Sequence, residues 1–187
     1  LRKWSVHVIR EGRSQYIGEV NESSEKMARC AALPETRRLL VFKGIPFAAP
    51  PLGSLRWQAP QPVKSWEGTR DASGFGNRCW ANVRVPSLAG RSGGVPLSED
   101  CLYLNLWTDA KTPSEKRPVM VWIHGGGFQF GTAGDPNTDG ALLAQKGVVL
   151  VSVNYRLGVF GFFAHPQLRS EGRLAGNFGI LDQIAAL

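Results

Sequence analysis

The strongest candidate for a binding or catalytic site in this sequence is a run of three glycines, Gly125, Gly126 and Gly127. They lie between His124 and Phe128. A glycine reaches positive φ without steric cost, so such a loop can turn several N–H groups toward one point. Converging N–H groups bind a phosphate, or they stabilise the charge that develops on a carbonyl oxygen during acyl transfer. A tight turn without a catalytic part is the third interpretation.

The spacing of the glycines argues against the two common phosphate-binding motifs. Gly125 and Gly127 match the first two glycines of G-x-G-x-x-G, but Phe130 occupies the third position. No G-K-S or G-K-T follows, which excludes a Walker A loop. Stabilisation of an oxyanion is therefore the favoured chemistry, and a plain turn is the alternative.

The elements on either side of the glycines predict where the loop lies. Residues 119–123 form a continuous apolar run, which predicts a strand buried on both faces, and residues 147–155 contain a second such run. Between them, Thr138 or Asp139 is a candidate helix cap, and Gly147 is a candidate helix end. Strand, helix and strand at this spacing predict a βαβ unit in a parallel sheet. The glycines then follow the carboxyl end of a strand, where ligands bind in such sheets.

Other stretches predict further elements around this unit. The alternation in CLYLNLW (residues 101–107) predicts a strand, and a β-type run over residues 39–42 predicts another. Residues 21–38 are polar, and a short helix after a Ser cap is one option there. Asn177 is a candidate N-cap for a last helix. Its apolar residues repeat at helical spacing: Ile180, Ile184 and Leu187.

Bulk properties exclude several classes of protein. The 187 residues suit a single domain with a sizeable core, and no run of 18 apolar residues predicts a transmembrane helix. The formal charge of +7 is scattered without a basic run, so we expect no nucleic-acid partner. We also expect no cofactor and no metal. None of the three cysteines (Cys30, Cys79 and Cys101) lies in a C-x-x-C pair, and their number allows one disulfide with one free thiol.

Five stretches together resemble the type-B carboxylesterase and cholinesterase family of α/β-hydrolases. They occur in that family's order over residues 39–187, whereas residues 1–38 do not match it. The resemblance implies the N-terminal part of an α/β-hydrolase fold, with a mostly parallel central sheet and flanking helices. The stretches are FKGIPFAAPPLGSLRW, SEDCLYLNLW, PVMVWIHGGGF, VSVNYRLGVFGF and GNFGILDQIAAL.

The same resemblance implies a serine hydrolase that acts on small carboxylic esters. In such an enzyme a Ser attacks the carbonyl, a His carries the proton and an acid orients the His. The family's Ser lies in G-x-S-x-G, on the strand after the helix that begins near Phe178, and the 187 residues contain no such motif. We therefore expect an N-terminal piece of a larger enzyme, inactive by itself. A catalytically dead adhesion or binding relative is the alternative, and a stand-alone binding module is a third reading; the intact glycines favour the enzyme.

The resemblance assigns roles to the glycine loop residue by residue. Gly126 and Gly127 align with the family's oxyanion donors, and Gly125 aligns with the glycine that shapes the loop. His124 is expected to brace the loop, because the family's catalytic base lies near the other end of the chain. Phe128 is expected to line the acyl pocket, or else simply to pack.

The SEDC segment implies a disulfide and a compartment. In the family its Cys pairs with one upstream, so Cys101 is expected to bond to Cys79, with two separate buried thiols as the alternative. Cys30 has no counterpart and is left free. A disulfide favours an oxidising, secreted or periplasmic location. Asn21 opens a glycosylation sequon, and the oligomeric state is not predicted.

The resemblance also implies two ion pairs and bears on choline specificity through one tryptophan. The resemblance pairs Arg56 with Glu99 and Arg156 with Asp182. A cholinesterase holds its choline-binding Trp in the loop before SEDC, well after the first Cys. Here that loop contains only Trp80, directly beside the first Cys, so a general carboxylesterase is favoured.

Overall fold

The computed structural model describes eight segments of the chain. It gives the backbone of residues 7–11, 14–18, 29–31 and 33–35, and backbone with side chains for residues 39–81, 94–112, 114–170 and 176–187, except the side chains of 169 and 170. The sequon at Asn21 lies outside the described residues. Within the region where a short helix was one option, Arg29–Ala31 (β3) and Leu33–Glu35 (β4) are strands.

A five-stranded mixed sheet forms the centre of the structure, in the order β10-β11-β9-β5-β4. β10 (Val119–Ile123) and β11 (Val149–Val153) are parallel, which confirms the predicted βαβ unit. β9 (Tyr103–Thr108) runs antiparallel to β11 and to β5 (Leu39–Pro46), and β5 runs antiparallel to β4. Among the described strands of this sheet only one pair is therefore parallel, and the mostly parallel character expected is not seen in this part.

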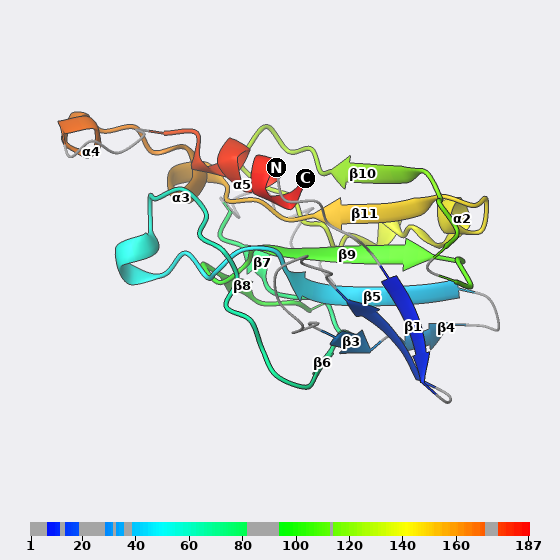
Figure 1. Cartoon of the computed structure of the whole chain (residues 1–187). Helices are drawn as coiled ribbons and strands as arrows, with labels where there is room; N and C mark the ends of the chain where they lie inside the picture. Colours follow the sequence, from blue (N-terminus) through cyan, green and yellow to red (C-terminus); the bar gives the residue numbers. More distant parts are fainter. Residues whose placement is uncertain are drawn as a thin grey trace.

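Smaller sheets flank the central one. β1 (His7–Glu11), β2 (Ser14–Gly18), β3 and β6 (Thr69–Asp71) form a four-stranded sheet in that order. β7 (Arg78–Cys79) pairs with β8 (Leu97–Ser98). These elements lie below β5 and beside it in Figure 1, away from β10 and β11.

The central strand β9 is buried on both faces. Alternation is typical of a half-buried strand, yet Asn105 and Trp107 are as buried as the leucines between them. Burial of an amide requires hydrogen-bond partners. Asn105 meets this need, because its side chain accepts from the N–H of Gly44 and donates to Ser152 Oγ and to the carbonyl of Ala133.

The prediction that residues 119–123 are buried on both faces is wrong. Val119, Met120, Trp122 and Ile123 are between 40% and 62% exposed. The reason is that β10 is the edge strand of the sheet and pairs with β11 on one side only (Figure 1), and no described helix packs extensively against its faces. An apolar run predicts that a strand prefers apolar contacts, but burial also requires that another element packs against it.

The connection between β10 and β11 holds short helices. A 3-10 turn (η3, Pro136–Thr138) leads to α2 (Ala141–Ala144). The N-cap position of α2 is Gly140 and no side chain caps the helix, so the prediction that Thr138 or Asp139 is the cap is wrong. The carboxylate of Asp139, one residue before the N-cap, still accepts a hydrogen bond from the N–H of Ala141 at 2.8 Å. Gly147 follows the helix with φ of +88°, the left-handed conformation that ends helices.

Four further helical segments are described. η1 (Gly53–Leu55) follows β5, and α3 (Gly158–Phe162), α4 (Pro166–Ser170) and α5 (Phe178–Ala186) follow β11. Figure 1 shows α3 and α5 at the end of the sheet toward which the arrows of β10 and β11 point. In the described part of the chain, no helix combines the length and apolarity needed to cross a bilayer.

Helix α5 begins where predicted, but its details differ. Asn177 occupies the N-cap position, as predicted, but it adopts a left-handed conformation (φ 59°) and its side chain makes no capping hydrogen bond. The residues that α5 buries are Phe178, Gly179 and Asp182, whereas Ile184 is 62% exposed. The buried face is thus chosen by contact with the segment that follows β11 rather than by the apolar repeat.

Candidate active site

The glycine loop and the segment after β11 leave the sheet side by side. β10 and β11 are parallel and in register, with Ile123 opposite Val153. His124 follows the first strand directly, and Tyr155 lies two residues beyond the second. Side chains from the second segment can therefore reach the backbone of the loop.

Three successive carbonyl groups of the loop are anchored. The hydroxyl of Tyr155 donates to the carbonyl oxygen of His124 at 2.8 Å. The His124 ring, through Nδ1, contacts the carbonyl oxygen of Gly125 at 2.9 Å. The N–H of Gln129 donates to the carbonyl oxygen of Gly126 at 3.0 Å, and the N–H of Phe130 approaches the same oxygen at 3.4 Å.

Anchoring the carbonyls aims the N–H groups that follow them. In a trans peptide the C=O and the next N–H point in opposite directions, and the described residues contain no cis peptide bond. The N–H groups of Gly125, Gly126 and Gly127 are therefore directed away from the anchoring atoms. Within the described part of the chain these three groups donate to no protein acceptor. They are available to an oxygen atom of a ligand.

Two positions in this loop require glycine for reasons of space as well as conformation. Gly126 has φ of +124°, and a Cβ there would lie 1.9 Å from the carbonyl oxygen of Phe130. Gly131 has φ of +126°, and a Cβ there would lie 2.2 Å from Nδ1 of His124. Real Cβ contacts are not this short, so any side chain would displace the loop.

The geometry around His124 fits the bracing role expected of it. The residue is 6% exposed, and its ring stacks on that of Tyr155 with centroids 4.4 Å apart and planes 16° apart. Burial lowers the pKa of His124, which favours the neutral ring. Because a carbonyl oxygen only accepts, the proton of that ring lies on Nδ1, where it points at Gly125.

Phe128 lies at the exposed rim of the loop. Its φ is 63°, its side chain is 45% exposed, and its carbonyl accepts from the N–H of Gly158 at 2.7 Å. The ring packs against Phe162 with centroids 4.6 Å apart and meets the edge of Tyr155 at 6.4 Å. An exposed aromatic ring held in this way offers an apolar surface beside the free N–H groups.

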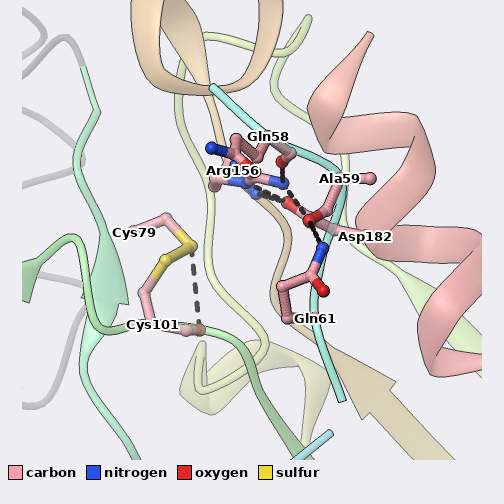
Figure 2. Close-up of polar contacts among 7 residues, drawn as sticks. All are labelled: Gln58, Ala59, Gln61, Cys79, Cys101, Arg156 and Asp182. Atoms are coloured by element: carbon pink, nitrogen blue, oxygen red, sulfur yellow. Dashed lines mark hydrogen bonds and ion pairs between the residues drawn. A yellow bond between two sulfur atoms is a disulfide. The ribbon is translucent and has the colours of Figure 1, made fainter. Parts of the chain in front are cut away.

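The predicted disulfide is confirmed. Cys79 and Cys101 are bonded, with Cα atoms 4.9 Å apart, and both are buried (Figure 2). Trp80, beside the first of them, is 44% exposed. Cys30 lies on β3, where only the backbone is described. The described residues contain no cluster of three His, Cys, Asp or Glu side chains suited to a metal ion.

Both of the expected ion pairs are present, and they differ in burial. Arg156 grips Asp182 by a two-bond fork, with Nε to Oδ2 at 2.8 Å and Nη2 to Oδ1 at 2.7 Å, and its backbone N–H also reaches Oδ2. Nη2 also donates to the carbonyl of Gln58 (Figure 2). This pair is almost wholly buried, at 3% and 0% exposure. Arg56 and Glu99 form a similar fork, but the arginine side chain is 40% exposed.

The predicted residues thus fall into two groups. His124, Gly125, Gly126, Gly127 and Phe128 lie together beyond β10. The disulfide and the ion-pair residues Arg56, Glu99 and Arg156 line one small cavity. The second group joins the segment after β11 to the SEDC segment and to the proline-rich stretch after β5.

Sequence reasoning missed three residues that hold the glycines in place. Tyr155 and Gln129 anchor carbonyls, and Gly131 leaves room for the His124 ring. Tyr155 carried a weak signal, since it is the last residue of the apolar run predicted over residues 147–155. The other two follow the glycines in a stretch without periodicity.

Solved structures identify the class of fold. The chain matches a structure titled PNB esterase with a TM-score of 0.76 and 39% identity, over 87% of this chain and 33% of that chain. A carboxylesterase of Geobacillus stearothermophilus gives a TM-score of 0.72 and 39% identity, over 87% of this chain and 32% of that chain. The mixed sheet and its flanking helices are therefore part of an α/β-hydrolase fold, which confirms the expected fold class.

Sequence comparison identifies the family. The carboxylesterase family profile matches residues 30–187, and the chain belongs to that family. It is 50% identical over 147 residues to fumonisin B1 esterase of Sphingopyxis macrogoltabida, covering 78% of this chain and 27% of that protein. It is 45% identical over 152 residues to the cholinesterase of Mus musculus, covering 78% and 24%. The chain spans about a quarter of the length of these curated relatives.

Proposed function

We propose that the whole protein is a serine esterase that hydrolyses small carboxylic esters through an acyl-enzyme, and that these 187 residues supply its oxyanion loop. One observation carries the proposal. The carbonyls of His124, Gly125 and Gly126 are all anchored, and the N–H groups that follow them have no acceptor among the described residues. Family membership supports the same chemistry.

In the proposed mechanism this loop acts when negative charge develops on the ester carbonyl oxygen. When a serine attacks the ester carbonyl, the carbonyl oxygen becomes an oxyanion, and donors at 2.7–3.1 Å stabilise it. Gly126 and Gly127 are the proposed donors, and Phe128 is the proposed wall of the acyl pocket. Because the donors are held before substrate arrives, the protein does not reorganise as the charge develops. No G-x-S-x-G occurs in the 187 residues, so the nucleophile, the acid and the base are assigned to none of them, and the isolated piece is expected to be inactive.

Two narrower parts of the proposal concern substrate and location. Trp80 lies directly beside Cys79, not deep in the disulfide-closed loop, which favours a general carboxylesterase over a choline-specific enzyme. The disulfide favours an oxidising compartment outside the cytosol. Both remain part of the proposal.

The test is expression of the complete reading frame. We expect hydrolysis of p-nitrophenyl acetate and butyrate, and covalent labelling of one serine by a fluorophosphonate probe. The chain of 187 residues, assayed beside it, should show neither. A folded complete protein without hydrolysis or labelling would reject the esterase and favour a binding relative on the same scaffold.

A further inference from the structure

Tyr155 holds the first residue of the glycine loop in two ways. Its hydroxyl donates to the backbone oxygen of His124 at 2.8 Å, and its ring stacks on the imidazole at 4.4 Å. The tyrosine is 2% exposed and lies two residues beyond β11, so it is fixed to the sheet. It therefore connects a strand of the central sheet to the start of a loop whose three glycines have no side chains to pack.

This contact is relayed to the proposed donors through two peptide groups. The hydroxyl orients the peptide between His124 and Gly125. The stacked imidazole is then held where Nδ1 meets the Gly125 oxygen at 2.9 Å, which orients the peptide between Gly125 and Gly126. The N–H of Gly126 belongs to that second peptide. A change at Tyr155 thus moves a donor without any direct contact to it.

We propose that Tyr155 is the positioning residue of the oxyanion loop, setting the direction of the Gly126 N–H through the backbone and ring of His124. The role rests on the proposed esterase function, and it acts on catalysis through another residue. An oxyanion donor acts over a narrow range of distances, so small rotations of a peptide matter. The ring of Phe128, the residue after the glycines, also lies near the Tyr155 ring, with centroids 6.4 Å apart in an edge arrangement.

The experiment compares Tyr155→Phe with Tyr103→Phe in the complete protein. The first variant keeps the stacked ring and removes only the hydroxyl. The control also loses a hydroxyl that makes one 2.8 Å hydrogen bond, but to Asp100 in the SEDC segment. We expect kcat for a p-nitrophenyl ester to fall about tenfold in Tyr155→Phe, less than the roughly 10²–10³ that follows complete loss of a donor. KM should change less than about threefold, because the donors act mainly on developing charge.

Two further measurements separate positioning from a general loss of structure. Affinity for a trifluoromethyl ketone, which forms a tetrahedral adduct, should fall with kcat in Tyr155→Phe and stay unchanged in Tyr103→Phe. Crystal structures of the wild type and of Tyr155→Phe should show the peptide between residues 125 and 126 rotated in the variant.

The outcomes distinguish this inference from the proposed function. Wild-type turnover with an unchanged kcat in Tyr155→Phe overturns the positioning role and leaves the esterase intact. A wild type without turnover rejects the esterase. In that case the crystal structures still decide, since an unmoved loop in Tyr155→Phe overturns the orienting role and a rotated peptide supports it.

Discussion

Replacement of Gly126 by alanine tests the oxyanion assignment most directly. A Cβ at this position would lie 1.9 Å from the carbonyl oxygen of Phe130, and contacts under 3.0 Å essentially never occur, so the loop must open by at least about 1.1 Å. The backbone also has φ of +124°, which alanine adopts only with strain. The shift falls on the segment that anchors the Gly126 carbonyl, because the N–H groups of Gln129 and Phe130 both approach it.

The expected magnitude follows from the distance. A displacement of about 1 Å takes a donor out of the 2.7–3.1 Å range in which it stabilises an oxyanion. Loss of one donor lowers kcat by about 10²–10³, or roughly 3–4 kcal/mol of transition-state stabilisation. KM should change much less, since the ground-state carbonyl carries little charge.

The assay is steady-state hydrolysis of a p-nitrophenyl ester by the complete protein, with circular dichroism and thermal melting to establish folding. Gly68→Ala is the matched control, because Gly68 also has positive φ (+73°) but its Cβ would meet nothing within 4 Å. The control should cost a little stability and leave kcat unchanged. A folded Gly126→Ala protein with the kcat of the wild type would refute the reasoning, and the glycines would then be only a turn.

Three other perturbations of the complete protein have expected outcomes. Cys79→Ala opens the disulfide and should lower stability by about 3 kcal/mol in denaturant unfolding, because the unfolded chain gains freedom; unchanged unfolding would contradict this. Asp182→Ala should lower the free energy of unfolding by roughly 3–5 kcal/mol, since it leaves Arg156 buried and unpaired. Glu99→Ala breaks a pair whose arginine is 40% exposed, so it should cost much less stability, because water screens that pair. Equal losses of stability in the two variants would contradict this difference in burial. Because burial lowers the pKa of His124, the unfolded chain takes up a proton first on acidification, so stability should fall as the pH drops below about 6.5. His124→Asn keeps a donor near the Nδ1 position but cannot take up the proton, so the melting temperature should depend less on pH below about 6.5. An unchanged pH dependence of the melting temperature would show that other groups cause it.

The local elements near the site were predictable because their signals are short-range. Apolar runs on either side of the glycines predicted β10 and β11, and the residues between them predicted a helix there, which is α2. The disulfide was predicted from the resemblance of a single segment, SEDC, and the structure confirms it. For the strands and the helix the information lies within a few residues of the element itself, whereas the disulfide joins cysteines 22 residues apart and was predicted only through the resemblance.

The burial of individual side chains was predicted less well. It depends on which other elements pack against a strand or helix, and the apolar repeat within the element does not specify them. The apolar strand β10 is exposed, since it is the edge of the described sheet. Alternation in β9 is typical of a half-buried strand, yet Asn105 is buried and satisfied by Gly44 and Ser152. In α5 the buried carboxylate of Asp182, not the exposed Ile184, decides which side faces inward.

The sequence by itself determined that a bare glycine backbone follows a strand, because residue type sets which φ values a chain can reach. Only the tertiary structure decided where its N–H groups point. That direction depends on the hydroxyl of Tyr155, 31 residues beyond His124, and on an imidazole stacked against its ring. Both contacts exist because two parallel strands end side by side in register. The sequence predicted the parallel pair, but not the register that places Tyr155 against His124, because register depends on contacts between residues far apart in the chain.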